Sequence, residues 1–94
     1  MANIDLNTLS DIQYATYNKI YNFTNGGSLS NCGVIYVNNS KNIRGWYLCS
    51  NIGGVLHIIY EEKLDGRAIK GLRTKGILKE ITSNKKPNVI IYSI

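Results

Sequence analysis

The sequence predicts an α+β fold, in which one N-terminal helix packs on a meandering antiparallel sheet of about five to six strands. Three observations predict it. Residues 9–23 show helical spacing of apolar side chains, the rest of the chain alternates short apolar runs with Gly, Asn and Ser turns, and 94 residues suit a single domain, 1–94. A domain of this size has room for one core and one surface site.

The helix is predicted over residues 9–23, LSDIQYATYNKIYNF. Ser10 can cap its first turn, and the carboxylate of Asp11 is favourable at that end. Asn25-Gly26-Gly27 should end the helix, because these residues readily adopt a left-handed backbone. The apolar residues approximate the i, i+3, i+4 spacing of one helix face: Leu9, Ile12, Tyr17, Ile20 and Tyr21.

The first hairpin is predicted to pair residues 33–38 with residues 43–49, in a register that puts Cys32 opposite Cys49. A cross-strand disulfide would be geometrically conceivable there, although nothing in the sequence requires one. The register also divides the apolar side chains between two faces, one with Ile35, Val37, Trp46 and Leu48 and the other with Val34, Tyr36 and Tyr47.

Two interpretations of the segment around Asp65-Gly66 stay open. In the first, these residues form a hairpin turn between two strands, which places Glu61 opposite Lys70. In the second, Asp65 caps a helix over residues 66–75, and the following strands form the wing of a winged helix. A winged helix needs another helix before this one, whereas the preceding GGVLHIIYEE is β-branched and opens with two glycines. We therefore favour the all-strand interpretation.

The last two strands are predicted over residues 77–82 and 89–94, with Lys79 facing Tyr92. The final strand, VIIYSI, would then be an edge of the sheet. An unpaired edge can pair with its own copy, so the sequence predicts a possible homodimer through this strand.

The distribution of charge is the strongest functional signal. The chain has a formal charge of +5, and residues 63–94 hold eight of its eleven Lys and Arg residues but two of its six Asp and Glu residues. Such a field suits an acidic protein surface or nucleic acid. Turns and loops can present charge to one side, and Tyr92 or Tyr60 could stack against a partner. The candidate partner-binding residues are Lys70, Arg73, Lys75, Lys85 and Lys86.

No catalytic set assembles from the sequence, and we expect no enzymatic activity, cofactor or metal. His57 is the only histidine, and Cys32 and Cys49 lack the paired spacing of a zinc site. A small nuclease that uses His57 with Arg67 or Arg73 is the enzymatic alternative.

The remaining expectations concern origin and location. No apolar run is long enough to span a membrane and no leader pattern is present, which predicts a cytoplasmic protein. The many Ile, Asn, Lys and Tyr residues are typical of an AT-rich genome. We therefore expect a small binding module or inhibitor, of phage or mobile-element origin, that docks on an acidic partner through its basic C-terminal third; a winged-helix nucleic-acid binder is the alternative.

Residues 50–94 resemble profilins in the order of a Gly-Gly strand, an Asp-Gly turn, a strand, an LRTK turn and a final hairpin, and an earlier hairpin with Trp46 fits the same order. The resemblance implies a central antiparallel sheet with flanking helices, no enzymatic activity, and an actin-monomer-binding surface to which Lys70, Arg73 and Lys75 would belong. The chain lacks the helical stretch that profilins place between the Trp hairpin and the Gly-Gly strand, and it also lacks their C-terminal helix. The resemblance therefore does not imply their polyproline site.

Overall fold

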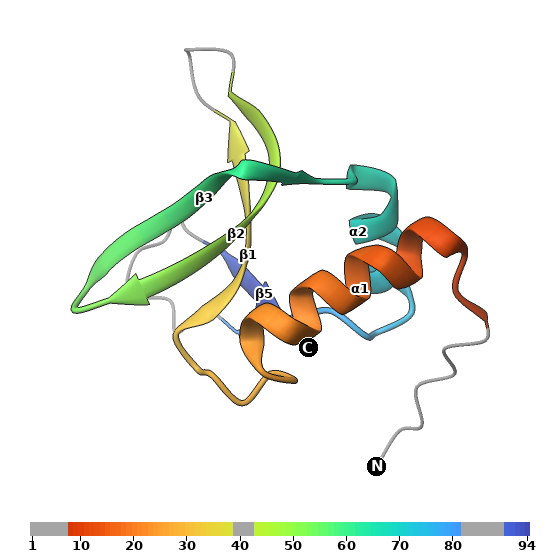
Figure 1. Cartoon of the computed structure of the whole chain (residues 1–94), viewed down its shortest axis with the longest axis horizontal. Coiled ribbons are helices and arrows are strands. Elements are labelled where there is room, and N and C mark those ends of the chain that lie inside the picture. Colours follow the sequence, from red (N-terminus) through yellow and green to blue (C-terminus); the bar gives the residue numbers. More distant parts are fainter. Residues whose placement is uncertain (1–7, 39–42, 82–89) are drawn as a thin grey trace.

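The computed structural model describes residues 8–38, 43–81 and 90–94. Five strands form one antiparallel sheet in the order β3-β2-β1-β5-β4 (Figure 1). The predicted α+β fold, with an N-terminal helix on an antiparallel sheet, is confirmed. The elements in chain order are α1 (Asp11–Thr24), β1 (Cys32–Asn38), β2 (Arg44–Ile52), β3 (Val55–Leu64), α2 (Gly66–Thr74), β4 (Lys79–Glu80) and β5 (Ile91–Ser93).

Helix α1 begins and ends where local signals place it. The Ser10 hydroxyl accepts a hydrogen bond from the Gln13 backbone N–H at 3.3 Å, and the Gln13 side-chain oxygen accepts one from the Ser10 N–H at 3.0 Å. This reciprocal pair is a capping box, which satisfies two donors at the start of the helix. The helix ends at Asn25, whose φ of 51° lies in the left-handed region.

Both helices pack on the same face of the sheet, as Figure 1 shows. The side chains of Ile20 on α1 and of Ile69 and Leu72 on α2 are 0% exposed. They form one core with Val34 on β1 and Leu48 on β2. This shared core is what holds α2 at a defined place beside the strands.

The register of β1 and β2 differs by one residue from the predicted one. Cys32 lies opposite Ser50, and Cys49 lies opposite Gly33, so the predicted opposition of the two cysteines is wrong. Cys49 is buried, which raises the pKa of its thiol to about 12, with a smaller contribution from Cys32. A shift of one residue changes which side chains share a face. The observed register therefore brings Val34 and Leu48 together under the helices.

Residues after Asp65 form a helix, so the favoured all-strand interpretation is wrong and Lys70 does not lie opposite Glu61. Asp65 is the N-cap, and its carboxylate accepts a hydrogen bond from the Ala68 N–H at 2.9 Å. The physical reason is burial: a helix turns Ala68, Ile69 and Leu72 to one side, whereas a strand would point Ile69 away from the other two. The element before α2 is a strand, not the helix that a winged helix requires.

Strand β5 lies inside the sheet, between β1 and β4. The expectation that the C-terminal strand is an edge is therefore wrong for residues 91–93, and with it the premise of a homodimer through that strand. The pairing of Lys79 with Ser93 also corrects the predicted opposition of Lys79 and Tyr92 by one residue. Close approach explains part of this placement, since a side chain at Gly33 of β1 would collide with the Tyr92 carbonyl.

Candidate functional site

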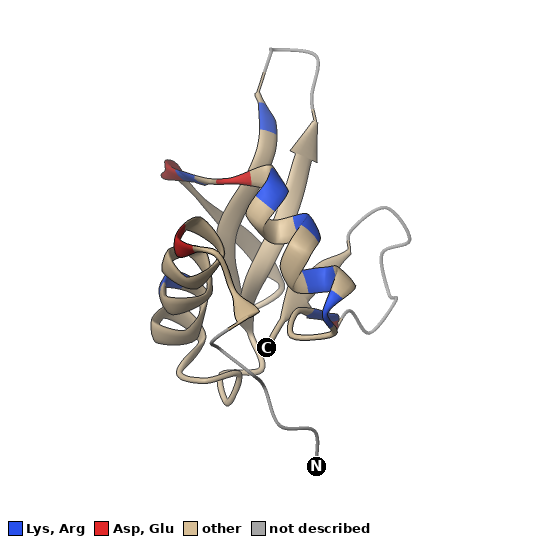
Figure 2. Cartoon of the chain, turned by 90° about the vertical axis from the view of Figure 1, so that its right-hand side faces the viewer, with Lys and Arg blue, Asp and Glu red and all other residues tan. Residues whose placement is uncertain are grey.

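Helix α2 gathers basic side chains on its exposed side. Arg67 and Lys70 are three residues apart, as are Lys70 and Arg73, and residues at this spacing are neighbours on a helix surface. All three are exposed, and we call them the basic face of α2. Figure 2 shows blue positions along α2. Strand alternation would have separated Lys70 from Arg73, so the change from strand to helix is what brings these two cations together.

Arg73 lies over two aromatic rings. Its guanidinium carbon is 4.6 Å from the ring centroid of Tyr92 and 5.7 Å from that of Trp46. Cations at these distances are attracted by the negative faces of aromatic rings. Arg73 contacts both rings while its side chain stays exposed, so a partner can still reach its charge.

Three aromatic rings form a continuous strip beside this arginine. Trp46 on β2 lies 5.3 Å from Tyr36 on β1 and 5.6 Å from Tyr92 on β5, measured between ring centroids. Tyr36 is paired with Trp46, and Tyr92 with Val34, so all these residues are on the face that carries the helices. Tyr36 is 45% exposed, while Trp46 and Tyr92 are half-buried. We call Tyr36, Trp46 and Tyr92 the aromatic strip.

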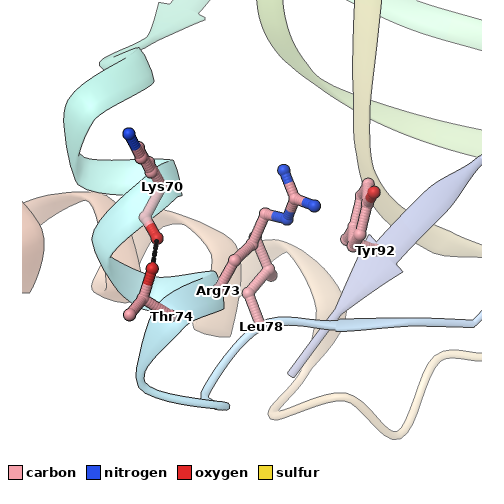
Figure 3. Close-up of a pocket in the computed structure, with 5 residues that line it drawn as sticks. All are labelled: Lys70, Arg73, Thr74, Leu78 and Tyr92. Atoms are coloured by element: carbon pink, nitrogen blue, oxygen red, sulfur yellow. Dashed lines mark hydrogen bonds between the residues drawn. The ribbon is translucent and has the colours of Figure 1, made fainter.

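An open hollow of about 490 Å³ separates α2 from β5. Its lining combines the cations Lys70 and Arg73 with the apolar surfaces of Leu78 and Tyr92, and Figure 3 shows the Arg73 guanidinium pointing toward the Tyr92 ring. The hydroxyl of Thr74 donates a hydrogen bond to the Lys70 carbonyl oxygen at 2.9 Å. A partner that combines negative charge with a flat apolar group would match this lining.

One carboxylate belongs to the same neighbourhood. Glu80 on β4 is paired with Tyr92 on β5, so its side chain is directed to the face of the aromatic strip. In the described part of the chain, neither Lys70 nor Arg73 forms an ion pair with it. The sheet face beside the hollow therefore carries one carboxylate as well as the two cations of the lining.

The structure separates the predicted site residues into three groups. Lys70 and Arg73 line the hollow together. Lys75 is directed elsewhere, because its ammonium donates a hydrogen bond to the Thr8 hydroxyl at 3.5 Å, before α1. Lys85 and Lys86 lie outside the described residues.

The aromatic predictions also divide. Tyr92 lines the hollow and its ring contacts Arg73, whereas the ring of Tyr60 packs on that of Tyr47, with the ring centroids 5.3 Å apart. Stacking of either ring on a partner stays a prediction. Sequence reasoning missed Tyr36 and Trp46 as part of this surface. The signal that could have found them is the hairpin register, because the predicted one placed these two side chains on opposite faces.

The alternative catalytic set does not assemble. His57 on β3 is paired with Ser50, near the β2–β3 turn, whereas α2 with Arg67 and Arg73 follows the other end of β3. Within residues 8–38, 43–81 and 90–94, no three His, Cys, Asp or Glu residues are grouped so that they could hold a metal ion. Over the same ranges, no helix is long and apolar enough to cross a membrane.

Comparison of the chain with protein-family models, with curated proteins and with solved structures found no match. The profilin resemblance of residues 50–94 therefore stays a prediction from the residues alone. What the structure itself defines is a surface: the basic face of α2 beside the aromatic strip.

Proposed function

We propose that this chain is a small non-enzymatic binding module that docks on an anionic macromolecule through the basic face of α2. The observation that carries the proposal is that two exposed cations three residues apart on α2, Lys70 and Arg73, line the same open hollow. Their charges lie in the C-terminal third, which holds most of the positive charge of the chain. A small inhibitor or accessory protein of cytoplasmic location would need only such a surface.

The chemistry of the lining supports binding without catalysis. Lys70 and Arg73 offer positive charge and N–H donors, Leu78 offers apolar contact, and Tyr92 offers an aromatic ring with a hydroxyl group. These groups hold and orient an anionic partner.

The experiment is a binding titration of the full chain with labelled single-stranded DNA, duplex DNA, RNA and poly-glutamate, at about 50 and 200 mM salt. If about three phosphates of a single strand are contacted, the affinity should fall roughly 20-fold between these salt concentrations. The double variant Lys70→Ala/Arg73→Ala should bind more weakly, and its dependence on salt should be shallower by roughly one unit of slope for each lost phosphate contact.

A matched variant tests whether binding depends on the basic face of α2 or only on the net charge of the chain. Lys19→Ala/Lys63→Ala removes the same two charges from α1 and β3, away from the basic face of α2. It should keep most of the affinity of the unmodified chain. Equal losses in the two double variants, or no binding of any polyanion at low salt, would contradict the proposal.

A further inference from the structure

We propose that the anionic partner is a single-stranded nucleic acid, a base of which stacks on Tyr36 of the aromatic strip while its phosphates bind Arg73 and Lys70. This inference rests on the proposed function and names its partner class. The juxtaposition that supports it is a guanidinium over Tyr92 and Trp46, next to a further exposed ring, Tyr36.

The position of Arg73 suits a phosphate. Contact with two rings restricts the long arginine side chain, so less conformational freedom is lost when it binds a phosphate. Lys70 lines the same hollow and offers a second cation to the same backbone. A cation pair beside a ring is suited to one nucleotide, with its phosphate on the charges and its base on the aromatic surface.

The exposed ring of the strip suits a base. Tyr36 is 45% exposed, although its ring contacts Trp46, so one part of the ring is packed and the rest is open to solvent. Proteins that bind single strands combine a positive groove with aromatic side chains, because every base has a face that can stack. Trp46 and Tyr92 are half-buried and lie beside Arg73, so Tyr36 is the ring of the strip on which a base can stack.

The aromatic strip also discriminates among anionic partners. In a duplex the faces of the bases are stacked on each other, so a duplex could use Lys70 and Arg73 but not the face of Tyr36. A surface that offers carboxylates alone would likewise use only the cations. Of these three partners, a strand with unstacked bases is the one that uses both the cations and the exposed ring.

The test uses the fluorescence of Trp46, which is the one tryptophan of the chain and lies in the middle of the strip. The full chain is titrated with single-stranded oligothymidylate, and inorganic polyphosphate and a DNA duplex serve as competitors. We expect oligothymidylate to quench Trp46, and we expect both competitors to displace it only at concentrations at least roughly 10-fold higher.

The decisive variant is Tyr36→Ala, and Tyr14→Ala on α1 is its matched control because Tyr14 is also 45% exposed. Tyr36→Ala should weaken binding of oligothymidylate roughly 10-fold to 100-fold and leave binding of polyphosphate unchanged. Tyr14→Ala should change neither. Tyr36→Phe should retain the affinity, which shows that the ring and not the hydroxyl is needed, and thermal melting confirms that each variant is folded.

The outcomes separate this inference from the proposed function. If duplex DNA or polyphosphate binds as tightly as oligothymidylate and Tyr36→Ala has no effect, the stacking inference is overturned while an anion-binding surface remains. Binding of poly-glutamate without binding of any nucleic acid overturns it as well and indicates an acidic protein partner. If no polyanion binds at low salt, the stacking inference and the proposed function are both overturned.

Discussion

The two helices of this protein share a core but present different chemistry to solvent. Ile20 of α1 and Leu72 of α2 are both 0% exposed and meet the same sheet face. The exposed side of the 14-residue helix α1 carries one acid, Asp11, and one base, Lys19, whereas the 9-residue helix α2 exposes Arg67, Lys70 and Arg73. Equivalent packing therefore coexists with unequal surfaces.

This difference teaches which part of the sequence is available for function. Burial constrains the inward side of each helix, because a core position must be apolar and of the right size. The outward side contributes little to stability, so its charges can serve a partner. The surface of α2 departs most from a neutral helix, and it is next to the aromatic strip.

The largest expected effect tests the shared core. Leu72→Ala and Ile20→Ala should each lower the free energy of unfolding by about 2–5 kcal/mol, since both side chains are fully buried. Urea denaturation followed by circular dichroism measures both. If Leu72→Ala lost less than about 1 kcal/mol while Ile20→Ala lost the expected amount, α2 would not be an equal part of the core.

The next effect compares the two N-caps. Ser10→Ala and Asp65→Ala should each cost about 0.5–2 kcal/mol, because each removes the side-chain acceptor for a backbone N–H of the first turn. Asp65→Ala should cost more, since it also removes a negative charge that is favourable at a helix N-terminus, worth about 0.3–1 kcal/mol.

Asp65→Asn is the control for this comparison, because asparagine keeps the cap and loses the charge. It should cost less than Asp65→Ala in the same urea titration. Equal losses for Asn and Ala would show that the hydrogen bond to Ala68 contributes nothing measurable.

A smaller effect lies at the contact between the helices. A side chain at Gly71 of α2 would collide with the amide of Gln13 on α1, the residue that completes the capping box. Gly71→Ala alone should be nearly neutral, because the gain in helix propensity, about 1 kcal/mol, is offset when Gln13 must move.

In the background of Gln13→Ala, the same Gly71→Ala change should stabilise the protein by roughly 0.5–1 kcal/mol. Melting curves of the two single variants and the double variant measure this coupling. If the effects of the two changes on stability simply add, position 71 does not contact Gln13. The two helices would then lie farther apart than in the structure.

The smallest expected effect on stability is that of substitutions on the exposed sides of α1 and α2, where the two helices differ most in charge. Lys70→Ala on α2 and Lys19→Ala on α1 should both change the free energy of unfolding by less than about 0.5 kcal/mol. Their effects on binding of a polyanion should differ, because only Lys70 lines the hollow. A large loss of stability in Lys70→Ala would assign this lysine a structural role in place of binding.

Prediction from the sequence was most accurate where the signals are local. Ser10 and Asn25 marked the ends of α1 correctly, because capping depends on residues within a few positions along the chain. It failed at Asp65-Gly66, since this pair suits both a hairpin turn and a helix start. Burial of Ile69 and Leu72 against α1 and the strands decided for the helix, and those contacts are distant in sequence.

The candidate site was predicted in the same uneven way. The positive charge of the C-terminal third is a property of composition and needed no structure. Lys70 and Arg73 lie on one face only because the segment is a helix. Trp46 and Tyr36 lie on one face only because of the observed hairpin register. Each of these depends on which face of an element is buried.

The sequence by itself determined the α+β class, the first helix with its caps, and the region of positive charge. These follow from hydrogen bonds and charges that neighbouring residues carry with them. Only the tertiary structure decided that α2 is a helix, that β5 lies between β1 and β4, and that Arg73 covers the rings of Trp46 and Tyr92. The reason is that these arrangements are selected by how completely distant apolar side chains can be buried together.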